Sequence, residues 1–219
     1  VIAANEIVGT QQWSHAVSIT AVIVALLSPL MGSLADKGGY RKMFMLGFTW
    51  LTIIATTVLY FVLPGEILKA LFWFVIANIG FEMGSVFCNA YLPDISHSKN
   101  IGRISGYGWS LGYVGGLIAL ALAMVFLIQT DTPIFGFAKG ELGAYENIRA
   151  TNLLVAIWFA LFSIPTFLFV KDHKPDTKAF FKNAKHTVKD FRATAKELKE
   201  YPQIMNFLIA RLVYNDGLV

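Results

Sequence analysis

Five stretches of this chain are apolar, almost free of charge and long enough to cross a lipid bilayer. A helix needs about 20 consecutive apolar residues to span the hydrocarbon core. The stretches that meet this length cover residues 16–35, 43–63, 70–92, 104–128 and 150–170. A further apolar run begins near residue 204 and continues to residue 219. We therefore expect an all-α fold: a polytopic transmembrane helical bundle of about five full spans and the start of another.

The composition excludes the main alternatives to a membrane protein. Charged residues make up 15% of the chain and hydrophobic residues 56%, whereas ordinary soluble domains carry about 25% charged residues. The single cysteine, Cys88, rules out an intrachain disulfide framework. The sequence contains no HExxH zinc pattern, no phosphate-binding P-loop and no GxSxG nucleophile pattern. We expect no enzyme activity, no catalytic residue, no metal site and no cofactor.

Basic residues are sorted between alternate loops, and this sorting predicts the topology. Cytoplasmic loops of membrane proteins are enriched in Lys and Arg. Fourteen of these residues fall in one set of alternate segments, namely 36–42, 93–103 and 171–205. The other set holds three, in residues 1–15, 64–69 and 129–149. We expect an integral membrane protein, in the inner membrane if the source is bacterial, with residue 1 outside and residues 171–203 in the cytoplasm. The positive charge then gives no reason to expect a nucleic-acid partner.

The long basic segment after the fifth span has the pattern of an amphipathic helix. Its apolar residues recur at steps of three and four, at Phe181, Ala184, Val188, Phe191, Ala195 and Leu198. Such a helix lies on a lipid surface or against the cytoplasmic ends of the spans. A simple linker whose basic face only sets the topology remains an equal alternative.

Glu82 is the candidate with the clearest functional meaning, because it is the one charged residue inside the five apolar stretches. A carboxyl group near the bilayer midplane is costly and marks a functional site by default. Asn78, Glu82, Ser85 and Asn89 recur at steps of four, three and four, so they share one helix face. We expect this face to line a cavity and to bind substrate or a proton. A structural ion pair between Glu82 and Arg211 is the alternative.

The last apolar run contributes two weaker candidates, Asn215 and Asp216. Both lie deeper in the predicted span than Arg211, which is close enough to its start to reach the interface. We expect them to take part in substrate or proton binding.

Three glycines in the fourth apolar stretch predict a site of close helix packing. Gly108, Gly112 and Gly116 lie four residues apart and therefore on one face. Small residues at this spacing let two membrane helices approach backbone to backbone. The face can be a static contact or a sliding surface between two parts of the molecule that move against each other.

The sequence GSLADKGGYRK at residues 32–42 resembles the cytoplasmic loop signature of the major facilitator superfamily. That signature joins the second and third spans of the family. The matching residues include Gly32, Leu34, Ala35, Asp36, Lys37, Gly39 and Arg41, with Lys42 following. Tyr40 departs from the pattern, standing where a basic residue is usual. The resemblance implies that Gly32, Asp36, Lys37, Gly39, Arg41 and Lys42 form a conformational gating loop.

Two further stretches narrow the resemblance to one branch of the superfamily. Residues 91–95 and 102–116, and later residues 212–217, are similar to the vacuolar amino-acid effluxers of autophagy and their bacterial relatives. The resemblance implies that the five spans correspond to the second through sixth of the family. Residues 1–170 are then the N-terminal-half bundle, 171–203 a cytoplasmic amphipathic linker helix, and 204–219 the start of the C-terminal-half bundle.

The resemblance also implies a function. We expect a secondary active transporter that moves a small polar solute, such as an amino acid, by alternating access, with proton coupling as an option. Its partners are the lipid bilayer, the solute, protons and the missing spans of the same polypeptide. The alternative is a membrane module without transport activity: a scaffold, a sensor or a lipid-surface-binding protein.

Overall fold

The computed structural model describes residues 6–170, 201–207 and 210, and these residues form a helical protein without β-strands. The long helices are α1 (Glu6–Gly38), α2 (Arg41–Leu59), α3 (Ile67–Ala90), α5 (Ile101–Ala123) and α6 (Glu146–Phe169). Each contains a segment long and apolar enough to cross a membrane. The expected all-α transmembrane bundle is confirmed.

Four short elements lie between the long helices. They are α4 (Leu92–Ile95), the π-helix η1 (Met124–Ile128) and the 3-10 helices η2 (Ile134–Gly136) and η3 (Glu141–Gly143). The π-helix continues α5 directly, so the expected span 104–128 is helical to its end but changes its hydrogen-bond pattern after Ala123.

Two helices differ in length from the apolar stretches that predicted them. α1 has 33 residues, which is about 50 Å at 1.5 Å per residue, so it extends well beyond the expected span 16–35. α2 ends at Leu59 instead of residue 63. The N–H groups of Tyr60, Phe61 and Val62 bond to carbonyls three residues back, and Gly65 then turns the chain with a φ of 93°.

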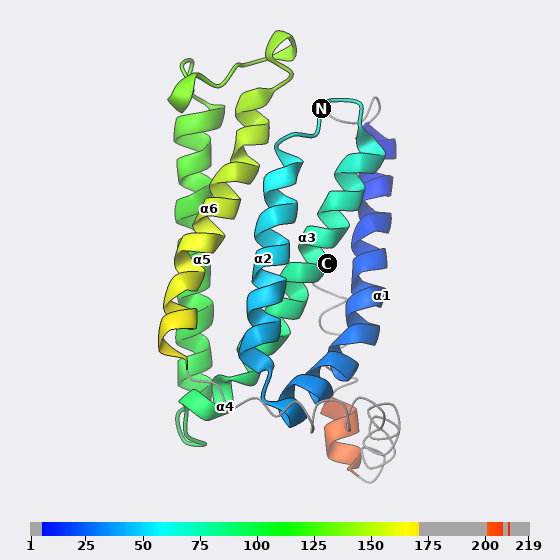
Figure 1. Cartoon of the computed structure of the whole chain (residues 1–219), viewed down its shortest axis with the longest axis vertical. Helices are drawn as coiled ribbons and strands as arrows, with labels where there is room; N and C mark the ends of the chain where they lie inside the picture. The colour runs from blue at the N-terminus through cyan, green and yellow to red at the C-terminus, as the bar shows by residue number, and fades with distance from the viewer. Residues whose placement is uncertain (1–5, 171–200, 208–209, 211–219) are drawn as a thin grey trace.

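The long helices run antiparallel and alternate between the two ends of the bundle (Figure 1). α1, α2 and α3 lie side by side, α6 packs on α2, and α5 packs on α6 at the edge. The α1–α2 turn, α4 and the end of α6 share one end of the molecule. The α2–α3 loop and the α5–α6 hairpin share the other. This arrangement places the described parts of the basic loops at a single end.

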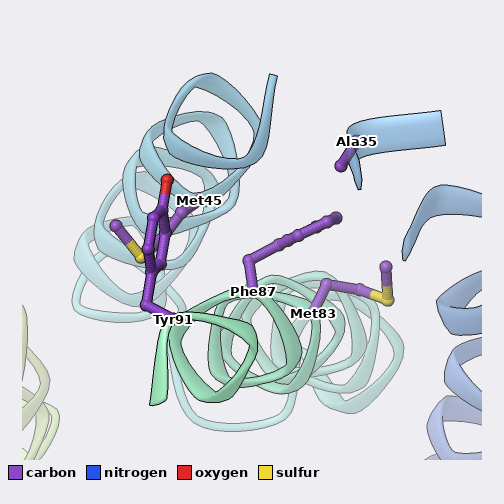
Figure 2. Close-up of a cluster of buried hydrophobic side chains, with 5 residues drawn as sticks. All are labelled: Ala35, Met45, Met83, Phe87 and Tyr91. Carbon is purple, nitrogen blue, oxygen red and sulfur yellow. The ribbon is translucent and has the colours of Figure 1, made fainter. Parts of the chain in front are cut away.

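A buried apolar cluster joins α1, α2 and the end of α3 next to the α1–α2 turn. Its members are Ala35, Met45, Met83, Phe87 and Tyr91 (Figure 2). The ring of Phe87 stacks on Phe44 and Phe48, with centroids 5.6 and 5.8 Å away. This cluster holds the end of α1, the start of α2 and the end of α3 together beside the turn that joins α1 to α2.

The helices α2 and α3 approach each other closely at Gly80. A Cβ atom on Gly80 would lie 2.6 Å from Thr52 Oγ1 and 3.0 Å from the carbonyl oxygen of Phe48. In contrast, a Cβ on Gly108, Gly112 or Gly116 would meet no described atom within 4 Å. The face predicted on α5 is therefore open among these residues, and its packing role stays a prediction.

Candidate functional site

A cavity of about 560 Å³ lies between α2, α3 and α6 and is reached by Trp13 of α1. Cavities of about 300–1,000 Å³ suit small-molecule ligands. Most of its wall is aliphatic or aromatic. The polar residues in the lining are Thr52, Thr56, Asn78, Arg149, Thr151 and Asn152. The cavity therefore offers hydroxyl and amide groups between largely apolar walls, and no carboxylate is among its described lining residues.

Asn78 is the predicted site residue that lines this cavity. It sits on α3 between Phe74 and Phe81, which also form part of the wall. Its amide makes no hydrogen bond within the described part of the chain, so both its donor and acceptor atoms are available to a ligand.

Glu82 and Asn89 lie on the same polar face of α3 but outside the cavity lining. Both are exposed, whereas the opposite face of α3 is buried against α1 and α2 through residues such as Gly80 and Met83. Within residues 6–170, Glu82 has no ion-pair partner. Arg211, Asn215, Asp216 and the linker helix fall outside the described residues, so the expected pairing and the second polar group stay predictions.

The sequence did not lead us to expect polar cavity residues on α2 and α6. On α2 the sequence does contain a pattern that indicates a polar helix face, because Thr49, Thr52 and Thr56 recur at steps of three and four. Thr52 donates to the carbonyl oxygen of Phe48 at 3.0 Å, a local bond that gives threonine a place inside an apolar helix. Asn152 donates to the carbonyl oxygen of Arg149 at 3.1 Å and also lines the cavity.

Arg149 lines the cavity at the end next to Tyr60, where its guanidinium is held by backbone carbonyl groups. Its Nη1 donates to the carbonyl oxygen of Tyr60 at 2.7 Å, and its Nε donates to that of Ala144 at 3.0 Å. Its guanidinium also lies 5.4 Å from the centre of the Tyr60 ring. Arg149 therefore ties α6 to the end of α2 and acts as a structural wall of the site.

The predicted gating loop contacts the ends of neighbouring helices. Gly39 takes a φ of 70° and reverses the chain between α1 and α2. Arg41 Nη1 lies 2.9 Å from Asp94 Oδ2 on α4. Lys42 Nζ donates to the carbonyl oxygen of Val170 at 2.7 Å, where a cation complements the negative end of α6. The loop therefore connects α2 both to α4 and to the residue that precedes the predicted linker.

For the other residues of the predicted gating loop, the structure describes the position of the backbone. Asp36 and Lys37 lie in the last turn of α1, and their side chains are outside the described part. A Cβ on Gly32 would meet no described atom within 4 Å, so this position is open to another helix. In the described residues, no group of three or more His, Cys, Asp or Glu side chains could hold a metal ion.

Comparison with known proteins identifies the family. The family described as "Vacuole effluxer Atg22 like" matches residues 14–219. The chain belongs to this family. It is 28% identical over 215 residues to the "Uncharacterized MFS-type transporter YxiO" of Bacillus subtilis, a match that covers 95% of this chain and 47% of the relative. It is 20% identical over 283 residues to "Autophagy-related protein 22" of Yarrowia lipolytica, covering 94% and 46%.

Membership of the Atg22-like family confirms the resemblance drawn from residues 32–42, 91–95 and 102–116. The chain spans about half the length of these two relatives. No solved structure matches it. This Atg22-like chain is thus an integral membrane protein of a transporter family, and its cavity and polar α3 face are the places to look for a solute site.

Proposed function

We propose that this chain forms half of a secondary active transporter that moves a small polar solute, such as an amino acid, by alternating access. The cavity between α2, α3 and α6 carries the proposal. Asn78, Thr52 and Thr56 all line this cavity and lie on apolar helices long enough to span a membrane. Polar groups inside membrane spans are expensive unless they serve a ligand or a partner.

The polar face of α3 extends this site toward Glu82 and Asn89. Glu82 is exposed within the described chain although it lies in a predicted membrane span. A lipid-facing carboxylate is strongly disfavoured, so this face needs a water-filled path or a polar partner. We assign Glu82 to proton binding or to contact with a cationic group of the solute, and the predicted residues Asn215 and Asp216 to the same path.

Transport by the full-length protein in proteoliposomes tests the proposal. We would measure uptake from a panel of radiolabelled amino acids, with and without an imposed pH gradient. Asn78→Leu should lower uptake about tenfold, since loss of a hydrogen bond worth about 1.4 kcal/mol changes affinity tenfold. Phe72→Leu is its control, because Phe72 is exposed on the same helix and outside the cavity lining.

Proton coupling is tested separately with Glu82→Gln, which should remove the response to the pH gradient. Glu66→Gln is the matched control on the α2–α3 loop. There the Leu63 N–H and Lys69 hold the pKa of Glu66 below its usual range, so it stays ionised. Normal gradient-driven uptake by the Glu82 variant would refute its proton role. Uptake of no panel member by the wild-type protein would refute amino-acid transport and favour the scaffold or sensor alternative.

A further inference from the structure

The hairpin between η1 and α6 has an energetically unfavourable backbone. Phe135, Ala144 and Tyr145 have φ angles of 62°, 49° and 52°. They are the non-glycine residues with positive φ in the described part of the chain. Side chains other than glycine disfavour this region, and such strain persists only where surrounding contacts enforce it.

Specific hydrogen bonds enforce this backbone. The N–H of Ala138 donates to Glu146 Oε2 at 3.0 Å, and the N–H of Asn147 donates back to the carbonyl oxygen of Ala138 at 3.1 Å. The buried side chain of Asn147 donates to the carbonyl oxygen of Leu127 at 2.9 Å. The hairpin is therefore fastened to the first turn of α6 and to η1.

The fastened hairpin carries two phenylalanines in different surroundings. Phe137 packs against Tyr60, with ring centroids 6.2 Å apart. Phe135 meets the Phe137 ring edge-on, with centroids 6.3 Å apart, and is otherwise 91% exposed. Its neighbour Ile134 is 38% exposed. A strained, well-anchored turn that displays a large apolar ring indicates a partner that is itself apolar.

We propose that Phe135 and Ile134 insert into the outer lipid interface and anchor the hairpin to the membrane surface. The turn follows the end of the apolar α5–η1 span at Ile128 by six residues. Val125 and Phe126, in the last turn of that span, are exposed apolar side chains as well. The ring therefore continues the apolar surface of a span that faces lipid, at the depth where side chains bury partly in the headgroup region.

Spin-label depth measurements on the full-length protein in phosphatidylcholine liposomes test this anchor. Native cysteines, including Cys88, are replaced by alanine, and a nitroxide is attached to Phe135→Cys or Ile134→Cys. Thr132→Cys and Lys139→Cys are controls at exposed polar positions of the same hairpin. Oxygen concentrates in lipid and a soluble nickel complex in water, so their relative access to the label reports its depth.

We expect oxygen access to exceed nickel access at residues 134 and 135, and the order to reverse at residues 132 and 139. Nickel access at 135 equal to that at 132 would overturn the proposal, because the ring would then be in water. A label at 135 that is immobile and shielded from both reagents would also overturn it, because protein would then cover the ring.

Discussion

A single glycine sets the distance between α2 and α3. Gly80 has no room for a side chain, since a Cβ would lie 3.0 Å from backbone atoms of Phe48 and Thr52. We expect Gly80→Ala to force α2 and α3 apart and to lower the free energy of unfolding by about 1–3 kcal/mol. Thermal unfolding of the purified protein in detergent, followed by intrinsic fluorescence, measures this loss.

The same helix supplies the control for this substitution. A Cβ on Gly84 would lie 4.0 Å from Phe48 Cβ, an ordinary contact. Gly84→Ala should therefore leave the unfolding temperature nearly unchanged. Equal losses from both variants would show that the close approach at Gly80 is not what limits stability.

At the scale of elements, the contact between Arg41 and Asp94 connects α2 to α4. The pair lies at 2.9 Å and is partly exposed, at 22% and 42% of the two side chains, so its contribution is about 0.2–1 kcal/mol. We expect Arg41→Glu to slow transport, because like charges would separate the α1–α2 turn from α4. Combining it with Asp94→Arg should restore part of the rate, as initial uptake measurements would show.

The variants that exchange the charges of Arg41 and Asp94 are compared with Lys42→Met. This substitution removes the donor to Val170 and leaves the Arg41–Asp94 pair in place. If the double variant transports no better than Arg41→Glu alone, the ion pair is not the relevant contact of the loop. If Lys42→Met transports normally, the contact between the loop and the end of α6 is dispensable for gating.

At the scale of the whole molecule, the helices alternate in direction, so alternate loops lie at the same end of the bundle. The distribution of Lys and Arg between the loops then predicts which end faces the cytoplasm. The gating loop and α4 share one end of the bundle, and the α5–α6 hairpin lies at the other (Figure 1). With Cys88 replaced, we expect Ser98→Cys to react with a membrane-impermeant maleimide from the cytoplasmic side alone. Thr132→Cys should react from the outside alone. The opposite labelling of both positions would invert the predicted orientation.

The all-α bundle could be predicted from the sequence because the cost of burying backbone and charge in lipid acts on each span separately. The apolar stretches therefore predicted the fold class, and the distribution of Lys and Arg between the loops predicted the orientation. Helical spacing also placed Asn78 and Glu82 on one face of α3, since residues four apart are neighbours on any helix.

Tertiary structure decided which faces meet. Spacing within α3 could not show that Asn78 lies in a cavity with Thr52 and Asn152 while Glu82 lies outside its lining. It also could not show that Lys42 reaches Val170, a residue 128 positions away. A periodic pattern defines the polar face of one helix, but the neighbour of that face is set by packing between helices, such as the backbone contact that Gly80 permits.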